Sequence, residues 1–197
     1  WFGTSNLTNT APIPAFSVLG EGGYEGRRVL LSYDAGRPVE ISPLTLEHLT
    51  PVGRSRDYHA AVGSSFSPMI MTSGHPVYDP DFEPGKPRLL FTNIVPRVAD
   101  FLSVNKPIRA DLYLMTWDGG PGEPTPPLRV TVDGKPVILR HASVHQLCVT
   151  RNYLVVFNAN LVLNTASLLE PLAPLMWRWL IEKRTEEVPR NLRVFYR

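Results

Sequence analysis

Proline and glycine interrupt this sequence at short intervals, and this is the feature that most limits the folds open to it. The 197 residues include 20 prolines and 14 glycines. Proline cannot continue a helix without losing a backbone hydrogen bond, and glycine favours turns, so the chain has little room for long helices. Hydrophobic residues make up 43% and charged residues 19%, which is typical of a folded domain and not of a disordered segment. The sequence therefore predicts many short strands joined by turns.

Short apolar runs bounded by turn residues recur along the chain. Asp133-Gly134 is a strong hairpin signal, and Arg151-Asn152 is typical of a second tight turn. The segment 119–127 is rich in proline and glycine, and we interpret it as a loop because strands resume on both sides. The predicted strands are 28–33, 88–95, 111–117, 128–132, 137–139, 144–150 and 153–157.

Strands at this spacing favour an all-β sandwich or propeller. A propeller blade takes about 40–50 residues, so the chain has room for roughly four blades, too few for a large closed ring. One strongly apolar stretch, 168–181, breaks the β pattern. Its two prolines, Glu170 and Arg178 argue against a membrane-spanning helix, which needs about 20 mostly apolar residues. It is either a core helix or packed loop, or a patch that dips into a membrane surface.

Charge and cysteine content narrow the cellular setting. A formal net charge of +2 is too small to indicate a nucleic acid as a partner. The single cysteine, Cys148, cannot form an internal disulfide, which favours a reducing compartment such as the cytoplasm. The first residues include neither an initiator methionine nor a signal-peptide pattern, so we expect the sequence to be cut from inside a longer protein.

Two histidines, His75 and His145, are candidate metal ligands. Pro76 pushes His75 toward extended geometry at a strand end, and His145 shares the inward face of an alternating run with Leu147 and Val149. About seventy residues separate the two, so they meet only if the chain closes into a sheet or barrel. Neutral imidazole binds iron, zinc or copper, and an all-nitrogen site with open positions suits a redox iron that admits oxygen. The alternative for each is a buried histidine bonded to a backbone carbonyl.

The other three histidines are weaker candidates. His141 has the same parity as His145 in the sequence and could compete with it for the ligand role. His48 and His59 lie in polar surroundings, and we expect them at the surface.

The sequence around both candidate ligands carries a family resemblance. Gly-His-Pro at 74–76 and the pattern Val-His-x-x-x-x-Thr-x-Asn-Tyr-x-Val-x-Phe at 144–157 resemble the histidine motifs of the carotenoid cleavage oxygenases. That family includes apocarotenoid and stilbene-cleaving dioxygenases and the retinoid isomerase of the visual cycle. Segments that resemble other elements of the family in the same order are 4–9, 32–38, 43–47 and, at the place of its membrane-facing patch, 168–181.

The resemblance implies a fold and a metal site. The family has a seven-bladed β-propeller with Fe(II) held by four histidines on inner strands, and His75 and His145 would be the first two ligands. Asp34 stands where the family usually has a Glu that orients one iron-bound imidazole, although Asp is one methylene shorter. Its alternative role is that of a turn residue before Ala35-Gly36. The third and fourth ligands would lie beyond Arg197, so 1–197 is expected to be a single partial propeller of roughly four blades, truncated at both ends.

The resemblance also implies an activity. The full enzyme would be a non-haem Fe(II) oxygenase that cleaves a conjugated C=C bond of a carotenoid or apocarotenoid with O₂ to give carbonyl products. Two alternatives stay open: a stilbenoid-cleaving member of the family, and a non-catalytic β-propeller binding module with two core histidines. This chain alone is expected to be inactive. A peripheral membrane contact is expected through a short apolar helix or loop with Leu175, Met176, Trp177, Trp179 and Leu180.

Overall fold

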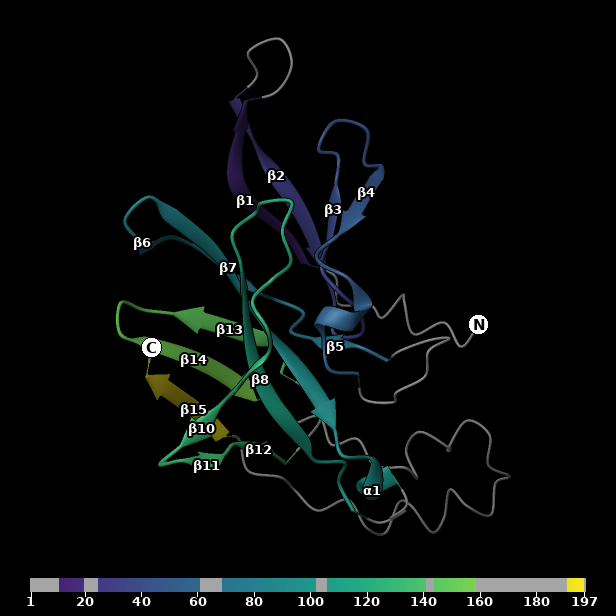
Figure 1. Cartoon of the computed structure of the whole chain (residues 1–197), viewed down its shortest axis with the longest axis vertical. Coiled ribbons are helices and arrows are strands. Elements are labelled where there is room, and N and C mark those ends of the chain that lie inside the picture. The colour runs from purple at the N-terminus through teal and green to yellow at the C-terminus, as the bar shows by residue number, and fades with distance from the viewer. Residues whose placement is uncertain are drawn as a thin grey trace, which may run out of the picture.

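The computed structural model describes residues 11–19, 25–60, 69–101, 106–140, 144–158 and 191–196. Within these ranges strands dominate, and the helical segments are the four-residue α1 (Val98–Phe101) and a 3-10 turn at Ser55–Asp57 (Figure 1). The predicted all-β class is confirmed. The described strands form four separate sheets without a closed ring, so the partial propeller stays a prediction.

The first sheet is an antiparallel meander of four strands. These are β1 (Ala11–Leu19), β2 (Glu25–Ser32), β3 (Val39–Ile41) and β4 (His48–Pro51), paired in that order. Alternate residues of β1 point into the core: Ala11, Ile13 and Ala15 are buried, whereas Pro12 and Pro14 are exposed. Strand β2 ends at Ser32, which places the bend at residues 34–36 beside the second sheet.

The second sheet is built on the long pair β7 (Lys86–Pro96) and β8 (Ala110–Trp117). Residues 89–94 of β7 are all buried because both faces of this strand are covered by other sheets. Four shorter strands flank the pair: β5 (Met71–Thr72) and β6 (Val77–Glu83) on β7, β9 (Leu128–Arg129) and β12 (Ile138–Leu139) on β8.

The two predicted turns are both present. Strands β10 (Thr131–Val132) and β11 (Lys135–Pro136) form a hairpin closed by Asp133 and Gly134, whose φ angles are 50° and 72°. The predicted strand 128–132 is divided at Val130, whose N–H donates to the Leu112 carbonyl at 2.9 Å and whose carbonyl accepts from the Val137 N–H at 2.9 Å. Strand β9 therefore pairs with β8, and β10 pairs with β11. The last sheet contains β13 (Gln146–Val149), β14 (Tyr153–Asn158) and β15 (Asn191–Tyr196).

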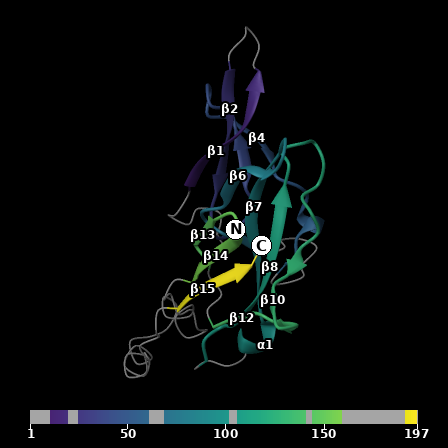
Figure 2. The same ribbon diagram turned by 90° about the vertical axis from the view of Figure 1, so that its left-hand side faces the viewer.

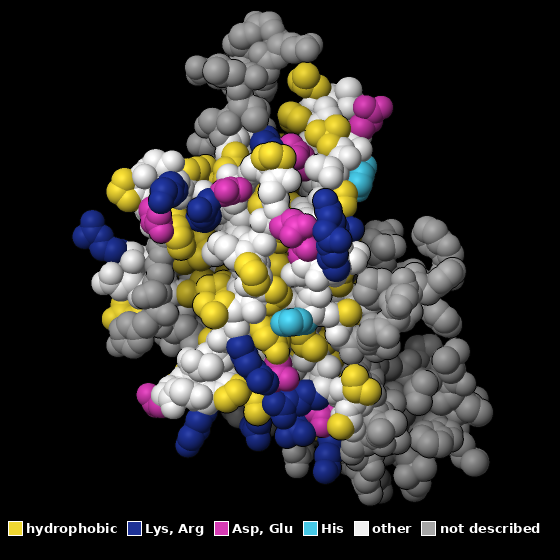
Figure 3. Space-filling model, viewed as in Figure 1, with side chains coloured by type: hydrophobic (Ala, Val, Ile, Leu, Met, Phe, Trp, Pro, Cys, Tyr) yellow, Lys and Arg dark blue, Asp and Glu magenta, His cyan; other side chains and the backbone are white. Residues whose placement is uncertain are grey.

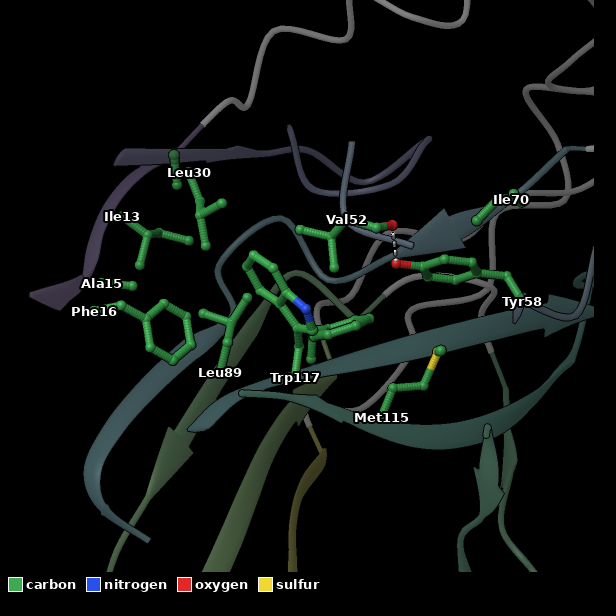
Figure 4. Close-up of a cluster of buried hydrophobic side chains, with 12 residues drawn as sticks. Ile13, Ala15, Phe16, Leu30, Val52, Tyr58, Ile70, Leu89, Met115 and Trp117 are labelled. Carbon is green, nitrogen blue, oxygen red and sulfur yellow. Dashed lines mark hydrogen bonds between the residues drawn. The ribbon is translucent and has the colours of Figure 1, made fainter. Parts of the chain in front are cut away.

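Two apolar cores lie on opposite faces of the second sheet. One fills the space under the first sheet, where Phe16 and Trp117 pack edge to face with ring centroids 5.5 Å apart (Figure 4). The other lies between the second sheet and β13–β14, and contains Ile94, Leu112 and Val156. Figure 2 shows β1, β2 and β4 of the first sheet in the upper part of the molecule, and β13, β14 and β15 beside β8 further down. The seams between the sheets are therefore apolar, and a polar group there needs a specific partner.

The segment 119–127 is a loop, as predicted, and it folds back on β8. The Thr125 N–H donates to the Thr116 carbonyl at 2.8 Å, and the Trp117 indole N–H donates to the Gly120 carbonyl at 3.2 Å. The apolar stretch 168–181 and the segment 4–9 lie outside the described residues.

Candidate metal centre

His75 and His145 lie side by side although they are far apart in the sequence. His75 stands two residues before β6 and His145 immediately before β13, so each precedes a strand of a different sheet. The two segments meet at an isolated parallel bridge between His75 and Gln146, and the His75 N–H donates to the His145 carbonyl at 2.8 Å. The imidazole ring centroids are 4.6 Å apart, with the ring planes at 83° to each other.

This spacing suits two ligands of one metal ion. A metal–nitrogen bond of about 2 Å and a distance of about 1.1 Å from nitrogen to ring centroid place two imidazole centroids about 4.5 Å apart at a right-angled coordination, and about 5 Å apart at a tetrahedral one. The observed 4.6 Å falls within this range. The same spacing also occurs in ordinary edge-to-face ring pairs, so the donor atoms must decide between the two roles.

Asp34 determines which nitrogen of His145 is free. The two carboxylate oxygens lie 3.0 and 3.1 Å from the His145 Nδ1 atom. Because an ionised carboxylate only accepts hydrogen bonds, Nδ1 is the donor in this contact, and in the neutral imidazole Nε2 then keeps its lone pair. A carboxylate on one ring nitrogen and an open lone pair on the other is the usual arrangement of a metal-binding histidine. The shorter Asp therefore does reach the imidazole.

The bend that carries Asp34 is tied to the segment before His75. The Thr72 N–H donates to the Asp34 carbonyl at 3.2 Å, and the Thr72 hydroxyl donates to the Gly36 carbonyl at 2.9 Å. One residue further on, the Ser32 hydroxyl donates to the Ser73 carbonyl at 2.9 Å. These bonds hold the backbone of the bend, so the position of the carboxylate does not depend on side-chain packing alone.

Asn93 holds the other side of this segment. Its buried side chain accepts from the His59 N–H at 2.7 Å and donates to the carbonyls of His59 and Met71 at 3.0 and 3.1 Å. The Asn93 amide thus links the backbone of His59 to the backbone of Met71, the first residue of β5. Sequence reasoning did not identify Asn93, Thr72, Ser73 or Ser32, although Thr72 and Ser73 directly precede the Gly-His-Pro motif.

A cavity of about 420 Å³ opens beside His75. The residues that line it besides His75 come from β13 and β14: Gln146, Leu147, Cys148, Val155 and Phe157. Its walls are largely apolar, and the candidate ligand His75 is one of the residues that line it. A small apolar group held in this cavity would lie next to the imidazole.

The remaining predicted positions divide into three groups. His48 and His59 are exposed, as predicted. His141 and the predicted membrane patch, with Leu175, Met176, Trp177, Trp179 and Leu180, lie outside the described residues. Within the ranges that the structure describes, no three His, Cys, Asp or Glu side chains form a group that could hold a metal, and none of the helices there is long and apolar enough to cross a bilayer.

Comparison with known protein families gives one match that covers most of the chain. The model of the retinal pigment epithelial membrane protein family, RPE65, matches residues 3–187 of the 197. Comparison with curated proteins and with solved structures gave no match. The match includes the bend with Asp34 and both histidine motifs. The chain therefore belongs to the RPE65 family, that of the carotenoid cleavage oxygenases and retinoid isomerases.

Proposed function

We propose that this chain provides His75 and His145 as the first two ligands of a non-haem Fe(II) oxygenase that cleaves a conjugated C=C bond of a carotenoid or apocarotenoid. Membership in the family supports a carotenoid-related oxygenase or isomerase. The observation that carries the finer proposal is the imidazole pair with its carboxylate: two rings 4.6 Å apart, one of them held by Asp34 through Nδ1.

Each of these residues has a separate task in the proposed site. His145 would present Nε2 to the metal because Asp34 occupies its Nδ1. His75 is placed by its backbone bond to His145, which sets the spacing of the pair. Fe(II), when bound, supplies the reduced metal that activates O₂. The four-histidine site of the family would require two further ligands.

The cavity beside His75 supports an apolar substrate. Its walls include Leu147, Val155 and Phe157, which suit a polyene better than a charged compound. Its polar side chains besides the histidine belong to Gln146 and Cys148. A stilbenoid would require hydrogen-bonding anchors for its phenol groups, so the two substrate classes are to be separated by assay.

The experiment uses the full-length protein that contains this sequence. The wild type and the variants His75→Ala and His145→Ala are purified, loaded with Fe(II) without oxygen, and tested for bound iron. They are then supplied with an apocarotenoid, a stilbenoid and O₂, and the carbonyl products are separated. We expect iron binding and apocarotenoid cleavage in the wild type and loss of both in the variants. A folded wild type that binds no iron would instead favour the non-catalytic binding module.

We also propose that the protein attaches to a membrane surface, because its substrates would reside there. In addition to the predicted apolar patch, basic side chains gather in the lower part of the face in Figure 3. Arg97 and Arg129 share the single carboxylate of Asp111, at 3.0 and 2.6 Å, so these three side chains together carry a net positive charge that would attract anionic lipid. Trp177→Ser with Trp179→Ser should lower binding to liposomes and leave iron binding unchanged. Unchanged liposome binding would contradict the patch.

A further inference from the structure

Gly74 lies where the Asp34–His145 contact crosses the segment before His75. A Cβ atom built on Gly74 would stand 2.7 Å from the Asp34 Oδ1 atom and 2.7 Å from both Cε1 and Nδ1 of His145. Gly74 is buried, and it is not one of the glycines with a positive φ. Its backbone conformation is therefore open to any residue, and what it requires is space.

The backbone on both sides of Gly74 is fixed. Before it, the Thr72 N–H donates to the Asp34 carbonyl at 3.2 Å, and after it, the His75 N–H donates to the His145 carbonyl at 2.8 Å. The segment is thus attached to the backbone of the same two residues whose side chains meet over Gly74. A side chain at position 74 could not be accommodated by a shift of the segment without stretching one of these bonds.

The size of the conflict follows from contact distances. A methyl carbon requires about 3.5 Å to a neighbouring heavy atom. The carboxylate and the ring, now at 2.7 Å from the ideal Cβ position, would each have to retreat by roughly 0.8 Å. Both atoms of the 3.0 Å hydrogen bond would have to move at once, so the contact could not keep its present geometry.

The geometry points to Gly74 as a positioning residue: its missing side chain lets a carboxylate as short as that of Asp34 reach His145. The residue at 74 and the length of the carboxylate at 34 are therefore coupled. With Gly at position 74, the carboxylate of Asp34 reaches His145 directly across the backbone. With a methyl group at position 74, the carboxylate needs the extra methylene of Glu to reach around that methyl group to the imidazole. In its consequence for metal binding, this inference rests on the proposed function.

The coupling is tested by a double-mutant cycle in the full-length protein. The variants are Gly74→Ala, Asp34→Glu and the combination of both. Gly122→Ala is the matched control, because a Cβ there meets nothing within 4 Å and Gly122 has no positive φ. The dissociation constant of Co(II), used as an air-stable probe, is measured by chelator competition, and thermal unfolding shows whether each variant is folded.

We expect Gly74→Ala to weaken Co(II) binding about 10–100-fold, the usual effect of losing the carboxylate partner of a metal-binding histidine. Gly122→Ala should leave binding unchanged. The double variant should bind Co(II) more tightly than Gly74→Ala and at least as tightly as Asp34→Glu. If the loss of Co(II) affinity in the double variant equals the product of the losses in Gly74→Ala and Asp34→Glu, the coupling is overturned. It is also overturned if Gly74→Ala binds Co(II) as tightly as Gly122→Ala. If Gly74→Ala does not fold, the Co(II) affinity of the double variant is compared with that of Asp34→Glu. Weaker binding by the double variant then overturns the coupling.

Crystal structures of the metal-free variants separate this inference from the proposed function. The distance from His145 Nδ1 to the carboxylate at position 34 should exceed hydrogen-bond range in Gly74→Ala and return to it in the double variant. That result supports the role of Gly74 even if the wild type binds no metal, in which case the proposed iron site fails by itself. An unchanged distance in Gly74→Ala overturns the role of Gly74, whatever the metal content.

Discussion

Removal of the Asp34 carboxylate should affect metal affinity more than fold stability. The Asp34 and His145 side chains keep 25% and 21% of their surface exposed, so solvent screens the contact between them. The backbone bonds of residue 34 do not involve its side chain and would remain in Asp34→Ala. We therefore expect the free energy of unfolding to fall by no more than about 1 kcal/mol.

The effect on metal affinity is larger because the carboxylate fixes the ring orientation and the tautomer. Loss of such a partner weakens metal binding about 10–100-fold, which corresponds to about 1.4–2.7 kcal/mol. Asp34→Asn should give an intermediate loss, because an amide oxygen still accepts from Nδ1–H but without the charge. The expected order of Fe(II) affinity is wild type, then Asp34→Asn, then Asp34→Ala.

The assay combines anaerobic chelator competition for Fe(II) with urea unfolding of the metal-free full-length protein. Asp81→Ala is the matched control, because Asp81 is an exposed residue of β6 outside the site. An Asp34→Ala variant that binds Fe(II) as tightly as Asp81→Ala would refute the orienting role. A loss of stability as large as the loss of affinity would show that the carboxylate is mainly structural.

Three further predictions concern the fold and the chain itself. The Arg109 guanidinium, hydrogen-bonded to Asp100, lowers the pKa of that carboxyl to about 2. Between about pH 4 and pH 2 the folded state therefore binds fewer protons than the unfolded state, so the free energy of unfolding falls as the pH drops through this window. In urea unfolding, Asp100→Asn should show a flatter fall there. Asn93→Ala should lower the free energy of unfolding by about 2–4 kcal/mol, since it removes three hydrogen bonds around a buried amide; a loss below about 1 kcal/mol in urea unfolding would show that water replaces the amide. The 197-residue chain alone, with two of the four ligands expected in this family, should bind Fe(II) weakly and show no dioxygenase turnover; polyene cleavage by it would contradict this.

The sequence alone predicts the long strands, because their apolar runs are bounded by turn residues. It does not predict β1, which contains Pro12 and Pro14. This strand lies at the edge of its sheet, where both prolines are exposed and the missing N–H groups leave no ladder bond open. Strands β3 and β5, of three and two residues, are too short to produce a period. Pairing with neighbouring strands defines them: β3 pairs with β2 and β4, and β5 pairs with β7.

In the candidate site, too, some features can be predicted from the sequence and others depend on tertiary contacts. The spacing and the motifs identify His75 and His145, and the structure brings them together. For Asp34, the two roles considered, a turn residue and a partner of the imidazole, occur together: the residue lies in a bend and its carboxylate reaches His145. The role of Gly74 could not be inferred, because an ordinary backbone conformation leaves no trace in the sequence and the requirement for space arises only from tertiary contacts.

The backbone bond between His75 and His145 has a consequence for the order of events in assembly. Closing a chain segment of about seventy residues lowers its conformational entropy, by about 4 kcal/mol at room temperature in the simplest chain model. Here the sheets close that segment, and the His75 N–H already bonds the His145 carbonyl before any ion arrives. An ion that meets the pair does not have to gather its ligands from a flexible chain, as it does in small zinc-dependent domains. For these two ligands, the metal affinity would therefore depend on the orientation of the rings, because folding has already closed the segment between them.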